Sequence, residues 1–272
     1  MTVKPQVRIV AIYVSVALLW VFFSDRLLLS LNVDEPTLSL LHSVKGSLYV
    51  VVTGALLYWL IDRTVRRMDR LNHRLLTGNE QSLRALVSAM DVRHKETRDH
   101  SERVMRMTVA LARRVGLEGD ALRNVRFGAL LHDIGKLALP DTVLIKPGPL
   151  TPEETEVMRT HPVLGRDLLM RTAFLRPAVD IPYAHHERWD GNGYPRGLRG
   201  EEIPLAARIF SVVDVWDALS FPRVYKPAWP EHEVLDYLRN AAGEQLDPGV
   251  VALFLEHYDE FKAIGLERLA QD

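Results

Sequence analysis

The chain has 272 residues, 47% of them hydrophobic and 25% charged, with a formal net charge of -1 and no cysteine. This length provides one or two domains and ample chain for a buried core. The balanced charge argues against a DNA- or RNA-binding surface, and the lack of thiols excludes disulfides and thiolate metal ligands. A metal site would have to use imidazole, carboxylate, carbonyl or water ligands.

Two apolar segments near the N-terminus predict a pair of transmembrane helices. Residues 9–24 and 46–61 each form a run of 16 residues without a charge. A bilayer takes about 20 residues, but the flanking Arg8 and Lys45 can reach the interface with their charged ends. The alternative is a buried helical hairpin in a soluble core. The predicted boundaries are a membrane anchor at 1–62, with spans at about 8–24 and 43–61.

Basic residues set the expected orientation of this anchor. Five arginines lie between residues 63 and 74, after the second span, and Lys4 and Arg8 precede the first. The loop between the spans holds only Arg26 and Lys45. Because Lys and Arg concentrate on the cytoplasmic side of a membrane, both termini are expected in the cytoplasm.

The segment after the second span is expected to be a juxtamembrane linker helix over residues 63–79. A rough apolar stripe runs along it and beyond, broken near Thr77-Gly78-Asn79. Two interpretations stay open: a parallel homodimer through the stripe, or packing of the stripe on its own domain. Sedimentation with and without residues 62–79 separates them. The stripe consists of Met68, Leu71, Leu75, Leu83, Leu86, Val87 and Met90.

Residues 80–272 are predicted to form an all-α domain, because their apolar spacing is helical almost throughout. Two helix starts are well marked. Thr151-Pro152-Glu153-Glu154 combines an N-cap, a first-turn proline and a capping-box glutamate. Asp247-Pro248 is expected to open the last helix in a similar way.

Eight histidine and carboxylate side chains in this domain are candidate metal ligands. An ionised aspartate beside a histidine in an apolar helix, as in His132-Asp133, is costly to bury unless a cation compensates it. A buried carboxylate at Asp214 would carry the same cost, whereas Asp217 is expected to be a structural hydrogen-bond acceptor. A satisfied core histidine is the ordinary interpretation of one such residue, but not of five. The candidates are Glu96, His100, His132, Asp133, His161, His185, His186 and Asp214.

The number and order of these ligands predict more than one metal ion. A single catalytic ion usually takes three protein ligands, fewer than are present here. Adjacent His132 and Asp133 would point about 100° apart on a helix, which suits a histidine on one ion and an aspartate shared by two. Imidazole and carboxylate ligands suit iron or manganese, with zinc as an alternative. Lys136 would lie near the same face, where its ammonium could meet a phosphate oxygen.

From about residue 80 to 262 the chain resembles the HD-GYP domain, a subgroup of the HD-superfamily metal phosphohydrolases. The matching motifs are His132-Asp133, His185-His186 and Gly193-Tyr194-Pro195, in family order. The resemblance implies an HD-type multi-helix domain that holds two or three divalent ions, iron or manganese. The N-terminal segment resembles the two-span anchors of other bacterial signalling proteins.

The activity that this resemblance implies is hydrolysis of the second messenger cyclic di-GMP to linear pGpG and, in some members, to GMP. The implied location is the bacterial inner (cytoplasmic) membrane, in two passes, with a cytoplasmic catalytic domain. Expected partners are cyclic di-GMP, membrane lipid, a second copy of the chain through the juxtamembrane helix and a diguanylate cyclase, without DNA or RNA. The alternatives are a hydrolase of another cyclic dinucleotide and a cyclic di-GMP receptor that does not turn its ligand over.

The same resemblance implies roles for single residues. The eight candidates match the metal-ligand positions of the family, and Glu96 matches the extra carboxylate of members with a third ion. Asp133 and Lys136 are implied as catalytic residues. The expected substrate contacts are Lys136, Tyr194, Arg223 and Lys226.

Overall fold

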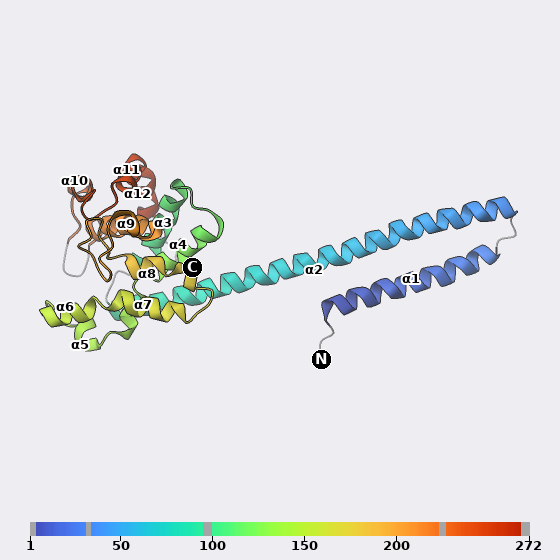
Figure 1. The fold of residues 1–272 in the computed structure, drawn as a ribbon, viewed down its shortest axis with the longest axis horizontal. Helices are drawn as coiled ribbons and strands as arrows, with labels where there is room; N and C mark the ends of the chain where they lie inside the picture. The colour runs from blue at the N-terminus through green and yellow to red at the C-terminus, as the bar shows by residue number, and fades with distance from the viewer. Residues whose placement is uncertain (1–3, 31–33, 95–99, 223–226, 268–272) are drawn as a thin grey trace. The chain divides into compact units, whose positions relative to one another are not determined.

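Helices form every regular element of the chain that the computed structural model describes (Figure 1). The described residues are 4–30, 34–94, 100–222 and 227–267. Within them the predicted all-α class is confirmed. The chain divides into two compact units, Met1–Gln81 and Ser82–Asp272. The finer domain boundaries expected at residues 62 and 79 stay a prediction.

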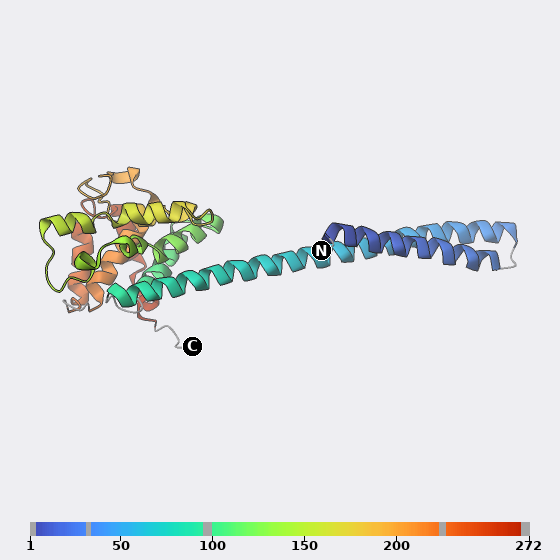
Figure 2. The same ribbon diagram turned by 90° about the horizontal axis from the view of Figure 1, so that it is seen from below.

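The first unit pairs two long helices. α1 (Pro5–Ser30) runs alongside the first part of α2 (Glu35–His94), as both views of the ribbon show (Figures 1 and 2). Lys45 of α2 forms an ion pair with Asp25 of α1. An ion pair therefore joins the two helices at this end.

Both helices contain a segment that is long and apolar enough to cross a membrane. Gln6–Leu28 has a mean hydropathy of 2.1 and Glu35–Leu71 one of 1.6. In the most apolar windows, none of the first segment and 11% of the second is buried. A core helix of a soluble protein would be mostly buried, so the exposure favours the predicted spans over the hairpin alternative.

The second helix continues through the predicted linker without interruption. Residues 63–79 belong to α2 and do not form a helix of their own. Of the predicted apolar stripe, Met68, Leu71 and Leu86 are exposed. Val87 and Met90 are buried in the core of the second unit and Leu83 packs against it, which favours packing of that end of the stripe on its own domain. A homodimer through the exposed part of the stripe stays a prediction.

The second unit starts in the last part of α2 and continues with short helices connected by turns (Figure 1). Its first elements are α3 (His100–Arg114), α4 (Gly119–Leu130), the 3₁₀ helix η1 (Ile134–Ala138), α5 (Asp141–Leu144), α6 (Pro152–Met158) and α7 (His161–Met170). Then follow η2 (Arg176–Ala178), α8 (Asp180–Ala184), η3 (Gly200–Glu202), α9 (Leu205–Ser220), α10 (Glu231–Ala241), α11 (Pro248–Glu256) and α12 (Tyr258–Leu266).

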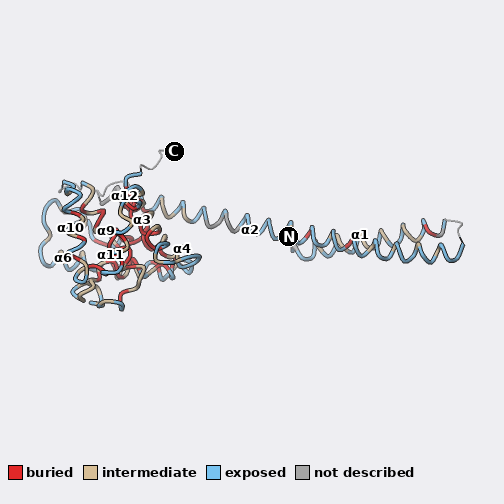
Figure 3. Tube along the Cα trace, turned by 90° about the horizontal axis from the view of Figure 1, so that it is seen from above, coloured by how far each residue is buried: buried red, intermediate tan, exposed pale blue. Residues whose placement is uncertain are grey.

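α9 lies at the centre of this unit and contacts α3, α8, α10 and α11. Its side chains Ile209, Phe210 and Trp216 are at most 2% exposed. Full burial of each such side chain contributes about 1.5–3 kcal/mol to folding. Figure 3 shows the buried positions gathered in these helices. The same helix carries Asp214 and Asp217, so the core holds both carboxylates in fixed positions.

Both predicted helix starts are present. The Thr151 hydroxyl accepts a hydrogen bond from the Glu154 backbone N–H at 3.3 Å, and the Glu154 carboxylate accepts one from the Thr151 N–H at 2.8 Å. Asp247 accepts hydrogen bonds from the backbone N–H groups of Gly249 and Val250, at 2.8 and 3.2 Å, and so caps α11. The expectation that this helix is the last one is wrong, because α11 ends at a non-helical turn at His257 and α12 follows.

Replacing Asp247 by alanine should destabilise the second unit. The change removes an N-cap, which typically costs about 0.5–2 kcal/mol. It also removes an ion pair with Arg208 of α9, whose Nη1 lies 2.6 Å from Oδ2 of Asp247. We expect the full-chain variant to unfold at a lower denaturant concentration than wild type, with unfolding measured by tryptophan fluorescence. Asp236→Ala, which removes an exposed carboxylate, is the matched control, and equal midpoints for Asp247→Ala and Asp236→Ala would contradict the capping role.

Candidate metal centre

His132 and Asp133 lie in a turn, not on a helix as the sequence predicts. α4 ends at Leu130, and the Leu131 N–H closes it by donating to the Phe127 carbonyl at 3.0 Å. η1 then begins at Ile134. Because the turn bends the chain between two helices, the adjacent side chains meet instead of diverging. Nε2 of His132 lies 3.2 Å from Oδ2 of Asp133, and both residues are buried.

A glycine brings a second histidine to Asp133. A Cβ atom at Gly135 would lie 1.9 Å from the carbonyl oxygen of His161 and 2.5 Å from the backbone nitrogen of Gly165. Only a residue without a side chain lets η1 and α7 approach so closely. His161 opens α7, is buried, and places its Nε2 3.3 Å from Oδ1 of Asp133.

Two groups of potential ligands flank Asp133. One group consists of His161, His185 and His186, and the other of His100, His132 and Asp214. Within each group the potential ligand atoms lie within 4.8 Å of one another. Oδ1 of Asp133 faces the group of His161, His185 and His186, 3.3 Å from His161 and 3.8 Å from His185. Oδ2 faces His132 of the other group. The carboxylate therefore stands between the groups, where one ligand could serve two ions.

The hydrogen bonds of the imidazole rings determine which nitrogen is free to bind a metal. Nδ1 of His132 lies 3.0 Å from the Ala129 carbonyl oxygen, and Nδ1 of His161 lies 2.9 Å from that of Met158. Nδ1 of His185 lies 3.1 Å from the Ile181 carbonyl oxygen. A carbonyl oxygen only accepts, so each Nδ1 carries the proton and each neutral ring presents its Nε2 lone pair to the cluster.

The resulting arrangement fits cations. Nε2 of His161 and Nε2 of His185 are 3.2 Å apart, and both face Oδ1 of Asp133. Lone pairs that face one another at such distances repel unless a positive charge lies between them. Imidazole, carboxylate and no thiolate is a donor set for iron, manganese or zinc. The geometry thus supports divalent ions, two with the ligands described.

Burial keeps His185 and His186 neutral, and Lys136 keeps Asp133 ionised. Burial lowers the pKa of His186 to about 3, with a smaller contribution from neighbouring His161. Burial likewise lowers the pKa of His185 well below its usual value. Burial opposes ionisation of Asp133, but the Lys136 ammonium holds its pKa well below the usual range. All three groups are therefore in the protonation state that binds metal at neutral pH.

Asp214 is less buried than the sequence predicts. Its side chain is 27% exposed, and Oδ1 lies 3.7 Å from Nε2 of His100. It lines a cavity of about 240 Å³ together with His185, His186 and Tyr194. The cost of burying the Asp214 charge, which suggested a ligand role, is therefore smaller than expected. The position of Asp214 beside His100 and His132 is the stronger reason to consider it a metal ligand.

The expected substrate contacts are only partly described. Nζ of Lys136 lies 2.5 Å from Oδ2 of Asp133. The Tyr194 ring stacks on the His186 ring, with centroids 4.7 Å apart and planes 23° apart. Burial raises the pKa of the Tyr194 hydroxyl to about 12. Arg159, which the sequence did not single out, also lines the cavity, its Cζ 5.3 Å from the Tyr194 ring centroid. Arg223, Lys226 and the ligand candidate Glu96 lie outside the described residues.

Two further interactions support the site. Nδ1 of His100 lies 2.7 Å from Oδ2 of buried Asp217, so the predicted hydrogen-bond acceptor orients a potential ligand. The three-residue spacing from Asp214 on α9 was the available signal. Buried Glu187 accepts hydrogen bonds from the backbone N–H groups of Arg196 and Leu198, at 2.8 and 3.0 Å, and so holds the loop of residues 191–200.

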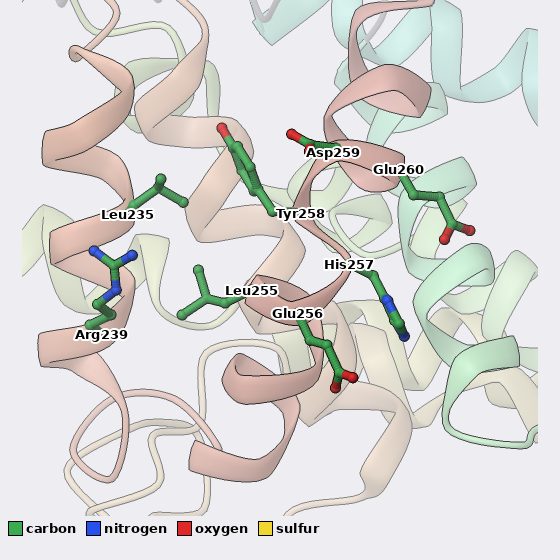
Figure 4. A pocket seen from close by; sticks show the side chains of 8 residues that line it. All are labelled: Leu235, Arg239, Leu255, Glu256, His257, Tyr258, Asp259 and Glu260. Carbon is green, nitrogen blue, oxygen red and sulfur yellow. The ribbon is translucent and has the colours of Figure 1, made fainter.

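A cavity of about 290 Å³ beside α10, α11 and α12 lacks such convergence. Leu235, Arg239 and Tyr258 line it, and Figure 4 shows Glu256 and Glu260 pointing away from Arg239. Among the described residues, no three potential metal ligands come together at this cavity, whereas two such groups lie beside Asp133.

Comparison with known proteins agrees with this geometry. The model of the family described as HD domain matches residues 67–250. The 3'3'-cGAMP-specific phosphodiesterase 2 of Vibrio cholerae is 39% identical over 181 residues, 66% of this chain and 35% of that protein. The cyclic di-GMP phosphodiesterase response regulator RpfG of Xanthomonas campestris is 42% identical over 177 residues, 64% of this chain and 47% of that protein. The chain thus spans less than half the length of either relative.

A solved structure shares the fold. The crystal structure of a cyclic GMP-AMP specific phosphodiesterase of V. cholerae aligns with a TM-score of 0.54 at 19% identity, covering 68% of this chain and 50% of that chain. At this identity the likeness concerns the helical fold alone.

Acidification should destabilise the metal-free protein through these histidines. The unfolded chain takes up a proton at His186 near pH 6.5, whereas the folded chain does so only near pH 3. Between these values the unfolded state binds more protons, so the free energy of unfolding falls as the pH falls, by up to about 1.4 kcal/mol per pH unit for this group. Denaturant unfolding at pH 7.5, 6.5 and 5.5 measures the slope.

His186→Asn should reduce that slope, because asparagine takes up no proton. Asn240→Gln, which changes an exposed residue of α10 without a titrating proton, should leave the slope unchanged. Equal slopes for wild type and His186→Asn would show that His186 does not titrate as described.

Proposed function

The chain belongs to the HD domain family, and we propose that it is a metal-dependent phosphodiesterase that hydrolyses cyclic di-GMP to linear pGpG or GMP. The observation that carries the proposal is the buried Asp133 carboxylate between two groups of potential metal ligands. Relatives named as cyclic di-GMP and 3'3'-cGAMP phosphodiesterases support the reaction class.

The proposed cofactor is two divalent ions, iron or manganese, and a third where Glu96 takes part. His161, His185 and His186 would hold one ion, and His100, His132 and Asp214 another, with Asp133 shared. Bound ions of this kind lower the pKa of an attacking water and neutralise charge on a phosphodiester. The protein supplies neutral imidazoles and an ionised carboxylate in a buried site, so little reorganisation is needed when ions bind.

The remaining proposed roles belong to residues around the cavity. Lys136 is held at Asp133, so its ammonium can stabilise a phosphate oxygen beside the ligand groups. Arg223 and Lys226 are proposed to bind the substrate phosphates. Tyr194 presents a partly buried ring at the cavity, suited to contact with a ribose or base. No nucleic-acid partner is proposed, because the net charge is -1.

The proposed location is the inner membrane of a bacterium, with α1 and the first part of α2 as spans and the HD domain in the cytoplasm. Length, apolar composition and the arginines after the second span support this orientation. A second copy of the chain could pair through the exposed stripe residues Met68 and Leu71. A diguanylate cyclase partner remains part of the proposal.

Hydrolysis by the full chain tests the proposed function. Protein loaded anaerobically with Mn²⁺ or Fe²⁺ should convert cyclic di-GMP to pGpG or GMP, measured by chromatography of the products. 3'3'-cGAMP and cyclic di-AMP in the same panel define the base preference. Asp133→Asn should abolish turnover and lower the metal content, because it removes the shared charge, whereas Asp236→Asn on the exposed face of α10 should change neither.

Intact cyclic di-GMP in the presence of normally bound metal would overturn the assignment. Tight binding of cyclic di-GMP without turnover would favour the receptor alternative. Turnover of 3'3'-cGAMP alone would keep the enzyme and change its substrate.

A further inference from the structure

The two ligand groups at the metal centre differ in the charge that surrounds them. We infer that the group of His100, His132 and Asp214 binds its ion first and more tightly, and that Asp217 is the positioning residue responsible. The inference rests on the proposed two-ion site and extends it to the order of metal loading.

Negative charge concentrates at the first group. Asp214 contributes a carboxylate of its own, with Oδ1 3.7 Å from Nε2 of His100. Behind His100, Oδ2 of Asp217 lies 2.7 Å from Nδ1. An ionised carboxylate only accepts, so Nδ1 donates and the Nε2 lone pair points at the site. A carboxylate in this position also raises the basicity of the ring as a ligand.

Arg103 holds the Asp217 carboxylate in place. Its guanidinium donates two hydrogen bonds, from Nε to Oδ1 and from Nη2 to Oδ2, the latter at 3.0 Å. The guanidinium also lies over the Phe221 ring, with Cζ 3.7 Å from the centroid. Asp217 is 2% exposed and Arg103 7% exposed. The chain from arginine to aspartate to histidine is therefore buried, so the ring of His100 cannot rotate without breaking it.

The second group consists of three histidines and has a different environment. Nδ1 of His161 and Nδ1 of His185 bond to main-chain carbonyl oxygens, which carry no net charge. Among the described residues, Asp133 is the carboxylate that faces this group, and it does so through Oδ1. The Lys136 ammonium is paired with the other oxygen, Oδ2. A cation at the first group would also draw on Asp133, so the second ion meets less negative charge than the first.

This difference makes the second ion the exchangeable one. Occupancy of the group of His161, His185 and His186 would then follow the concentration of free metal, while the first ion stays bound. A device of this kind would couple turnover to the supply of metal.

Titration of the metal-free full chain with Mn²⁺ tests the order, by calorimetry and by electron paramagnetic resonance of the bound ion. Wild type should bind two ions with affinities at least about 10-fold apart, the first with the spectrum of an isolated ion and the second giving a coupled pair. Asp217→Asn should weaken the first event about 10- to 100-fold and leave the second nearly unchanged. Asp236→Asn is the matched control and should bind as wild type does.

His161→Asn examines the other group and keeps the inference falsifiable if Asp217→Asn does not fold. It should retain the first event at wild-type affinity and lose the second. Two equal affinities in wild type would overturn the inference, as would loss of the first event in His161→Asn. Because the readout is metal binding, loss of the inferred order is distinguishable from a failure to hydrolyse cyclic di-GMP.

Discussion

The constraint on which the site depends is the Asp133 carboxylate, buried among imidazole lone pairs. Nε2 atoms of His132, His161 and His185 approach its oxygens at 3.2, 3.3 and 3.8 Å. None of these nitrogens carries the ring proton, because the Nδ1 atoms donate to carbonyl oxygens. Such an arrangement is unfavourable without positive charge, and Lys136 supplies only one charge at one edge. Divalent ions would complete it.

The fold provides this arrangement through close packing. Gly135 lets η1 touch the start of α7, so His161 reaches Asp133. The core residues of α9 fix the helix that presents Asp214 and Asp217. His185 and His186 then stay neutral because burial lowers their pKa, which is the state a metal requires. The free energy that core packing contributes thus offsets the cost of holding unsatisfied ligands together.

Sequence alone predicted the all-α class and the eight candidate ligands, of which the structure brings seven together. Glu96 is the eighth and lies outside the described residues. The residue types and their spacing along the chain were enough to predict the ligands, because few buried environments tolerate so many histidines together with a carboxylate. The path of the chain was harder to predict. The turn at His132-Asp133 depends on how α4 ends, which its helical apolar pattern does not reveal.

Tertiary contacts explain what sequence reasoning missed. Asp217 was expected to accept a hydrogen bond, but its donor, His100, lies 117 residues away in sequence. α12 was not separated from α11, because a single non-helical turn at His257 divides two apolar stretches. The continuity of α2 through residues 63–79 likewise follows from unbroken backbone hydrogen bonding, not from the apolar stripe.

Anomalous X-ray diffraction from crystals grown with Mn²⁺ tests the central claim most directly. Two peaks should appear, one among His161, His185 and His186 and the other among His100, His132 and Asp214, with the Asp133 carboxylate between them. A single peak, or peaks away from Asp133, would contradict the shared-carboxylate site.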